Sequence, residues 1–365
     1  GRLNAIGREG KLPRHPHGTL QMTRPLLRNA AMIFFASMNL GCSYDAAMAY
    51  TPPPDPVTAD GLWTASAAAP AILRVAPEQL LAGGNAVPSI AILTPSAHLS
   101  ALNGVAFDAD GTLWITSAVD SVLVAFSPAA LASSGQVAAS RRVTSAAGSL
   151  SAPSSAAFDA QHRLWVANCE SGTIVRFDRA QLATSGAPTP AVVIATGGHP
   201  ASIAFDASGS LWASGVRQNE IVKYGAAQLA ASGSPVPEAR ITVSGTPLVD
   251  PAGIAFDADG TLWLSNSGHQ SVIAFTAAQQ SAGGAQAPHI VLALHPPAVS
   301  VPTGLAFDAD GSLWVMSEDG RLAKFARAAL AESGAPLPDT RLVLTGYGLI
   351  WSAAIWPTPA ALPIN

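Results

Sequence analysis

The chain has 365 residues, 49% of them hydrophobic and 12% charged, with 29 Pro and 32 Gly. This composition favours a large core with many turns over long solvated helices. Residues 42–365 carry 13 basic and 22 acidic side chains, and so acidic a body excludes a binding surface for nucleic acid or anionic lipid.

The first 49 residues are predicted to direct export. Residues 1–21 contain no Met and are interpreted as translated upstream sequence, so that the natural protein begins at Met22. Residues 22–49 then form an export signal, in which two arginines precede the apolar stretch at residues 30–40. This stretch is too short to span a bilayer comfortably.

Two cleavage sites fit this signal. The letters NLGC resemble a bacterial lipoprotein box, in which Cys42 would carry the lipid and anchor the protein to a membrane. The letters AMA at residues 47–49 would instead allow ordinary cleavage before Tyr50. Both predict a periplasmic, outer-membrane or extracellular protein. The other cysteine, Cys169, then has no partner for a disulfide, and residues 50–59 form a Pro-rich linker.

An internal repeat organises the rest of the chain. The letters FDADGTLW occur twice, and three close copies accompany them. The Trp of each copy recurs at intervals of 51, 51, 47, 51 and 51 residues, at Trp63, Trp114, Trp165, Trp212, Trp263 and Trp314. A period near 50 with strand-like content predicts one four-stranded propeller blade per copy, and therefore six blades within residues 60–365.

Within one copy the pattern predicts three successive strands. Residues 104–108 form a short apolar strand, and ADG forms a hairpin turn, because Asp and Gly tolerate the positive φ that a tight turn needs. Residues 112–117 and 121–126 form the second and third strands. Apolar residues occupy both faces of these strands, which fits a blade packed between two others.

A second motif follows the third strand, as in SPAALASSG at residues 127–135. Ser127 is an N-cap candidate, Pro128 suits the first helical position, and Gly135 suits the helix exit. We therefore expect a helical turn on the rim of the blade. An outer strand follows, as at residues 191–196.

The two ends of the repeat array predict how the ring closes. The first copy begins at residue 60 without an innermost strand, whereas residues 350–362 align with an innermost strand and then stop. The C-terminal strand is therefore expected to complete the N-terminal blade, which leaves no open edge. The predicted fold is an all-β, six-bladed propeller, and we expect a monomer.

The repeat also carries a family resemblance. The letters PAGIAFDADGTLWLSN, residues 251–266, resemble an NHL repeat and the repeats of the SMP-30/gluconolactonase and virginiamycin B lyase families. The resemblance extends over about residues 60–362 and implies a six-bladed propeller. It also implies a site on the face formed by the loops before the first and after the second strand of each blade, opposite the Asp-x-Asp-Gly turns.

The Asp-x-Asp-Gly turns raise the question of a metal site. A helix–loop–helix calcium loop needs a distal Glu, but Val119 stands at the twelfth position from Asp108. Another copy has Gln161 and His162 in place of the second Asp and the Gly. A hairpin tolerates such exchanges and a metal site does not. We therefore predict a turn and expect no cofactor, and the sequence gives no support for a divalent cation.

Two positions in each blade are expected to line the mouth of the propeller. One follows the place of the Pro before the innermost strand, at Asn103, Ser154, Ala201, Ala252, Thr303 and Trp351. The other lies three residues after the repeat Trp. We predict ligand binding by a small, neutral ring at these positions: Asn103, Ser117, Asn168, Asn266, Thr303 and Trp351. The indole of Trp351 either stacks a cyclic ligand such as a sugar or plugs the channel where the chain ends meet.

These positions lack the catalytic residues that the resemblance implies. Resemblance to virginiamycin B lyase implies a His at the first position and a Glu at the second, and no blade has either. Resemblance to the gluconolactonase family implies metal ligands at several first positions, of which only Asn103 matches. One ligand does not hold a divalent cation.

A lactonase- or lyase-like enzyme is the alternative interpretation. Glu170 and His199 lie in loops of adjacent blades and Arg217 lies one loop further, so that the three form a candidate acid–base set; otherwise they are solvated loop residues. The preferred hypothesis is an exported, non-catalytic propeller that binds an unidentified small molecule or protein. It would touch a membrane only through a lipid on Cys42.

Overall fold

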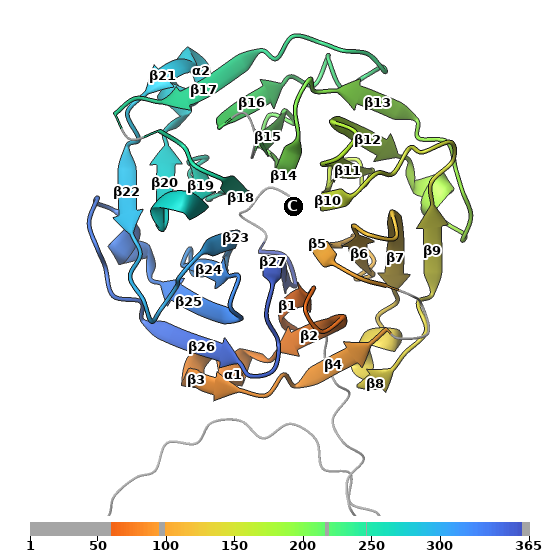
Figure 1. The fold of residues 1–365 in the computed structure, drawn as a ribbon, viewed down its shortest axis with the longest axis horizontal. Coiled ribbons are helices and arrows are strands. Elements are labelled where there is room, and N and C mark those ends of the chain that lie inside the picture. The colour runs from red at the N-terminus through yellow and green to blue at the C-terminus, as the bar shows by residue number, and fades with distance from the viewer. Residues whose placement is uncertain (1–59, 95–98, 216–218, 246, 360–365) are drawn as a thin grey trace, which may run out of the picture. The chain divides into compact units, whose positions relative to one another are not determined.

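The computed structural model describes residues 60–94, 99–215, 219–245 and 247–359. These residues form six sheets arranged as blades around a central axis (Figure 1). The predicted six-bladed, all-β propeller is confirmed. The expected upstream segment, export signal and linker, with Cys42, lie outside the described residues.

The two inner layers of strands contain the repeated letters. The innermost strands are β5 (Leu102–Phe107), β10 (Pro153–Phe158), β14 (Pro200–Phe205), β18 (Pro251–Phe256), β23 (Pro302–Phe307) and β27 (Ile350–Trp356). The second strands, each with a repeat Trp, are β1 (Gly61–Ser66), β6 (Leu113–Ser117), β11 (Leu164–Asn168), β15 (Leu211–Gly215), β19 (Leu262–Asn266) and β24 (Leu313–Ser317). Every residue of these second strands is buried, which fits their apolar pattern on both faces.

The two outer layers complete each four-stranded blade. The third strands are β2 (Ala71–Val75), β7 (Val122–Phe126), β12 (Thr173–Phe177), β16 (Glu220–Tyr224), β20 (Ser271–Phe275) and β25 (Arg321–Phe325). The fourth strands are β4 (Ile90–Leu93), β9 (Arg141–Thr144), β13 (Val192–Ala195), β17 (Ala239–Val243), β22 (Ile290–Ala293) and β26 (Thr340–Leu344). Neighbouring strands among these four pair antiparallel throughout.

The N-terminal blade is completed by the last strand of the chain, as the repeat array predicts. β27 pairs antiparallel with β1, and Leu62 lies opposite Ile355 while Trp63 lies opposite Ala354. In Figure 1 the blue β27 lies against the orange-red β1 at the inner end of one blade. One sheet therefore holds residues from both ends of the described chain, and this closes the ring.

Short helices form on the rim, as the second motif predicts. They are α1 (Pro77–Ala82), η2 (Ala130–Ala132), η3 (Arg179–Leu182), α2 (Ala277–Ala282) and η5 (Arg327–Leu330), while η4 (Ser267–His269) lies in another loop. In four blades a glutamine accepts from the amide that precedes the rim turn and donates to the carbonyl eight residues further on: Gln79, Gln181, Gln228 and Gln279. None of the described helices has the length and hydropathy to cross a bilayer.

The glycine after each rim turn also joins two blades. It pairs in parallel with the fourth strand of the preceding blade, at Gly84 in β3 (Gly84–Ala86), Gly135 in β8 (Gly135–Gln136), Gly186, Gly233, Gly284 in β21 (Gly284–Gln286) and Gly334. The sequence indicated only a helix exit here. The pairing satisfies main-chain groups on the outer edge of each blade, which would otherwise be an exposed strand edge.

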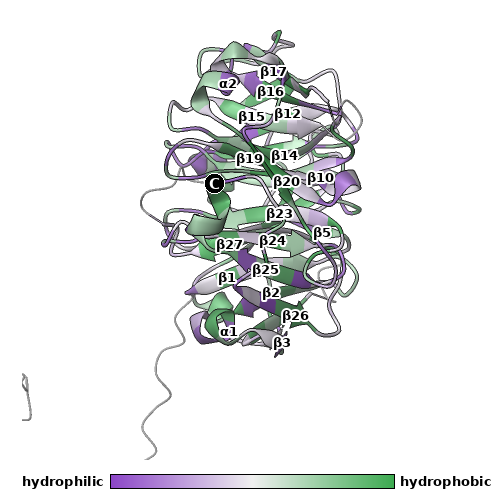
Figure 2. Ribbon diagram, turned by 90° about the vertical axis from the view of Figure 1, so that its left-hand side faces the viewer, coloured by the Kyte–Doolittle hydropathy of each residue, from purple (hydrophilic) through white to green (hydrophobic). Residues whose placement is uncertain are grey.

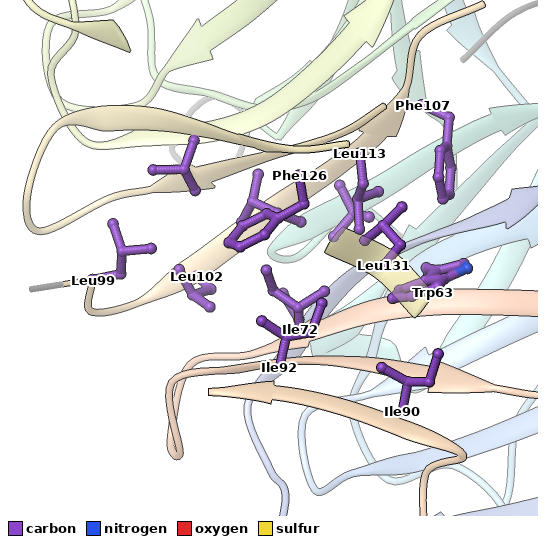
Figure 3. Packing of buried hydrophobic residues seen from close by; sticks show 14 of the residues in the cluster. Trp63, Ile72, Ile90, Ile92, Leu99, Leu102, Phe107, Leu113, Phe126 and Leu131 are labelled. Carbon is purple, nitrogen blue, oxygen red and sulfur yellow. The ribbon is translucent and has the colours of Figure 1, made fainter. Parts of the chain in front are cut away.

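The core lies between the blades. Each of six apolar clusters joins two neighbouring blades, and Figure 3 shows Trp63 and Ile72 of one blade facing Leu113 and Phe126 of the next. In four of these contacts a repeat Trp packs edge-on against the Phe that ends the next innermost strand, with ring centroids 6.0–6.3 Å apart. Such aromatic pairs add to the stabilisation from buried area. In Figure 2 the hydrophobic colouring follows the strands.

The strands nearest the axis approach one another closely. A Cβ atom added to Gly104 would lie 2.8 Å from the Cα of Ser155, and one added to Gly253 would lie 2.3 Å from the carbonyl oxygen of Thr303. Real Cβ atoms do not make such short contacts, so these positions admit only glycine without a shift of the backbone. The small residues of the repeat therefore set the width of the central channel.

Candidate functional site

The Asp-x-Asp-Gly motif forms the turn between the first and second strands, and its first Asp holds that turn. Asp108 Oδ1 accepts from the amides of Asp110 and Thr112 at 3.0 and 2.9 Å, and its Oδ2 accepts from Trp114 Nε1 at 3.2 Å. The same three bonds recur at Asp159, Asp206, Asp257 and Asp308. Both oxygens of this carboxylate are therefore engaged in fixing the hairpin to the buried indole.

The second Asp has a different role from the one that the sequence suggested. We expected the second Asp, like the first, to shape only the hairpin. Instead, Asp110 forms an ion pair with Arg179 at 2.7 Å and Asp259 forms one with Arg327 at 2.9 Å, and each arginine belongs to the next blade. All four side chains are about two-thirds exposed. Within the described ranges, no three His, Cys, Asp or Glu side chains gather closely enough to ligate a metal.

The opposite face contains a cavity at the predicted mouth. Its volume is about 290 Å³, and its walls include Asn103, Ala118, Ala152, Ser154, Cys169, Ala201, Ala252 and Trp351. Five of the six first positions predicted from the repeat lie in this lining. A smaller cavity of about 80 Å³ lies along the axis, with Thr358 and Pro359 among its walls. We call the larger space the mouth cavity.

Two of the six predicted mouth residues line the mouth cavity. Trp351 is 40% exposed, and Asn103 is partly buried; its side chain makes no hydrogen bond to the residues described here. The indole therefore forms an open wall of the cavity. This is not the environment of a buried plug, for which a fully covered side chain is expected.

The other four predicted residues lie buried beside the cavity and hold its loops. Ser117 Oγ lies 2.8 Å from the Ser100 carbonyl oxygen and accepts from the Ser100 amide at 3.3 Å, and Thr303 Oγ1 donates to the Ile350 carbonyl at 2.6 Å. The amide oxygens of Asn168 and Asn266 accept from the main-chain amides of Ser151 and Val249. The structure thus places Ser117, Asn168, Asn266 and Thr303 outside the lining, and their part in binding a ligand stays a prediction.

Asp120 is a further loop anchor that the sequence reasoning missed. Its Oδ2 accepts from Ser117 Oγ at 2.6 Å and from the amide and hydroxyl of Ser100. Burial disfavours the charged carboxylate, but hydrogen bonds from Ser117 and Ser100, with Arg142 nearby, outweigh it and lower the pKa of Asp120. An Asp shortly after the second strand was the available signal; Asp319 likewise accepts from Ser300 Oγ at 2.7 Å.

The candidate acid–base residues have separate partners. His199 Nδ1 lies 2.6 Å from the Cys169 carbonyl, so Nδ1 is the protonated nitrogen. Glu170 is exposed and accepts from Ser151 Oγ at 3.2 Å. Arg217 lies outside the described residues. Neither Glu170 nor His199 is among the residues that line the mouth cavity, whereas their neighbour Cys169 is.

Comparisons with known proteins agree with the fold. A family model described as SMP-30/Gluconolactonase/LRE-like region matches residues 87–205, about a third of the chain. A protein of unknown function from Bacteroides caccae aligns with a TM-score of 0.54 at 12% identity, over 80% of this chain and 97% of that one. No curated protein matches the sequence.

Two further solved structures align with lower scores. Selenomethionine-substituted virginiamycin B lyase from Staphylococcus aureus gives a TM-score of 0.43 at 14% identity, over 71% of each chain. Regucalcin, a calcium-binding protein from Agrobacterium tumefaciens, gives 0.45 at 15% identity, over 68% of this chain and 76% of that one. The resemblance inferred from the repeats is confirmed: the chain is a six-bladed β-propeller whose residues 87–205 match the SMP-30/gluconolactonase type.

Proposed function

We propose that this protein is an exported, monomeric, non-catalytic propeller that binds a small cyclic organic ligand in the mouth cavity. The observation that carries the proposal is the open indole wall formed by Trp351 in a cavity of about 290 Å³. The binding requires no metal and no cofactor. Nucleic acid is not a partner, and a membrane is touched only through a lipid on Cys42.

The walls of the mouth cavity suit a ring with one apolar face. The indole of Trp351 and the methyl groups of Ala118, Ala201 and Ala252 offer apolar surface. Asn103 offers a carboxamide, with both donor and acceptor groups, for hydroxyl or carbonyl groups on the edge of the ring. Apolar walls with a few polar groups are typical of small-molecule sites, and aromatic side chains stack on flat ligands.

The hydrogen-bond partners of the candidate acid–base residues support a binding role. A general base must reach the proton that it removes, directly or through one water. Glu170 is bound to Ser151 and His199 to the Cys169 carbonyl, and neither lines the mouth cavity. The two side chains therefore do not converge on the space where a ligand would lie.

The test begins with a thermal-shift screen of saccharides, lactones and larger macrocycles. Trp351→Ala should reduce the affinity for a confirmed ligand at least tenfold and abolish the ligand-dependent change in Trp emission. Because the side chain is 40% exposed, the free energy of unfolding should fall by less than about 2 kcal/mol. Addition of EDTA should leave the affinity unchanged.

Trp356→Phe is the matched control. Trp356 lies on the same strand but packs on Phe107, with ring centroids 4.8 Å apart, and does not line the mouth cavity. This change should leave the affinity intact. A ligand that binds equally well to the Trp351→Ala variant would contradict the proposal. Turnover of the ligand, seen by mass spectrometry, would instead favour the lactonase- or lyase-like enzyme.

Export is tested on the full chain in a bacterial host. Mass spectrometry of the mature N-terminus distinguishes lipidated Cys42 from an unmodified chain that starts at Tyr50. If the lipid is present, Cys42→Ser should release the protein from the membrane fraction. A protein that keeps its whole N-terminus and stays in the cytoplasm would contradict export.

A further inference from the structure

Two pockets on the turn face, opposite the mouth cavity, have matching walls. One lies between the blades of β6 and β11, and the other between those of β19 and β24. The matching residues are Asp108 and Asp257, Asp110 and Asp259, Trp114 and Trp263, and Arg179 and Arg327. In both pockets the second Asp of the turn pairs with the arginine of the next rim helix. The repeat thus provides two copies of one site.

In the first copy the protein fills the site with its own guanidinium. Arg141, on β9, places its Cζ atom 5.0 Å from the centroid of the Trp114 ring. Its two terminal nitrogens donate to the Leu182 carbonyl at 3.0 Å and to Thr112 Oγ1 at 3.2 Å. The volume that remains is about 40 Å³.

In the second copy the guanidinium is missing. Ile290 on β22 holds the register position of Arg141, because Ala274 pairs with Ile290 as Ala125 pairs with Arg141. The volume here is about 270 Å³. Gly311, which replaces His162 in the wall, widens the pocket further.

The second copy keeps the groups that the first copy uses for a guanidinium. Leu330 stands where Leu182 offers its carbonyl, and Thr261 stands where Thr112 offers its hydroxyl. Asp257 is engaged by its turn and Asp259 by Arg327, as Asp108 and Asp110 are engaged in the first copy, but this pocket has one arginine fewer and so a more negative charge. A planar group with several donors and a positive charge matches this set better than a compact ammonium does.

We infer that the pocket between β19 and β24 binds a guanidinium group from outside the chain, in the place that Arg141 fills between β6 and β11. The group belongs either to a small guanidinium compound or to an arginine side chain of a peptide. This site is separate from the mouth cavity and does not depend on the function proposed for it.

The probe is ethylguanidinium, with ethylurea as a neutral control of similar shape. Calorimetry on the unmodified protein should give one saturable site in the millimolar range, as expected for so small a ligand, and no binding of ethylurea. Ile290→Arg should fill the pocket and weaken binding at least tenfold. Arg141→Ile combined with His162→Gly should open the first copy to the same extent and raise the stoichiometry from one to two.

A second variant guards against misfolding, and a second ligand separates the two sources. If circular dichroism shows that Ile290→Arg does not fold, Gly311→His takes its place. It introduces the residue found at the matching position of the first copy, His162, and should narrow the pocket and weaken binding similarly. A capped Gly-Arg-Gly peptide that binds at least tenfold more tightly than ethylguanidinium indicates a peptide ligand, and equal affinity indicates a small molecule. Absence of saturable ethylguanidinium binding, or binding that neither pocket variant changes, would overturn the inference.

Discussion

The two faces of the propeller use the same repeat in different ways. On the turn face, five blades repeat the Asp carboxylate, its two main-chain amides and the indole almost without change. On the mouth face, the first position varies among an amide, hydroxyls, methyl groups and an indole: Asn103, Ser154, Ala201, Ala252, Thr303 and Trp351. The comparison teaches that residues repeated across five blades hold the fold, whereas the proposed ligand site lies where the repeat varies.

Removal of the closing strand should have the largest effect, because it breaks the frame that both faces share. Deletion of residues 350–365 removes β27 and exposes the inner edge of β1. We expect an insoluble chain, or a loss of stability well above the roughly 1 kcal/mol typical of a point change. Thermal unfolding and solubility measure the effect. Deletion of residues 360–365 alone, which keeps β27, is the control; equal melting of all three chains would refute the closure.

The two carboxylates of one turn should differ in their effect on stability. Asp108→Ala removes three hydrogen bonds and leaves the buried Trp114 N–H without its acceptor, so the free energy of unfolding should fall by about 2–3 kcal/mol. Asp110→Ala removes only an exposed ion pair and should cost less than about 1 kcal/mol. Denaturant unfolding compares the two. Equal losses would show that the first Asp has no special place in the turn.

The smallest predicted effect concerns the pH dependence of stability. Burial raises the pKa of Asp206, but hydrogen bonds from Ser208, Trp212 and the Ser210 amide, with Lys223 nearby, outweigh it and hold this pKa below its ordinary value. The resulting stabilisation is fully present above the unfolded pKa of about 3.9 and is lost as the pH falls through the lower, folded value. The stability difference between the unmodified protein and Asp206→Asn should therefore shrink below about pH 4.

A weaker variant sharpens this test. Ser208→Ala removes the hydroxyl that donates to Asp206 Oδ1 at 2.5 Å and leaves the main-chain amides in place. It should keep part of the acid-dependent change that Asp206→Asn removes, when unfolding is followed from neutral pH to about pH 2. If the stability difference between Asp206→Asn and the unmodified protein is the same at every pH, the carboxylate does not stabilise the fold through its charge.

Most of the fold was predictable because each blade is built from local signals. The spacing of the repeat Trp gave the number of blades, and the alignment of residues 350–362 with an innermost strand gave the closure. The rim glycines were interpreted only as helix exits, because their pairing with the preceding blade joins residues about 40 positions apart. Nothing in the local pattern around Gly186 or Gly334 indicates that partner.

The candidate site was less predictable than the fold. The repeat indicated which positions face the mouth, and Asn103 and Trp351 do line the cavity. It did not separate them from Ser117 or Asn168, since a small polar side chain at the end of a strand serves equally well for binding a ligand or for holding a loop. Hydrogen-bond partners in other segments decide between the two roles. Ser117 contacts Ser100 and Asn168 contacts Ser151, so both hold loops.

The sequence alone determined the six-bladed ring, the position of each strand within its blade and the hairpin role of the Asp-x-Asp-Gly turns, because period, apolar pattern and turn chemistry act over a few residues. Only the tertiary structure decided which interblade pockets the protein fills with its own side chains. The guanidinium of Arg141 fills one interblade pocket while Ile290 leaves its counterpart empty, and this difference depends on side chains of neighbouring blades that meet only when the ring is closed. Local propensity sets the blade, and packing between blades sets which pockets stay unfilled.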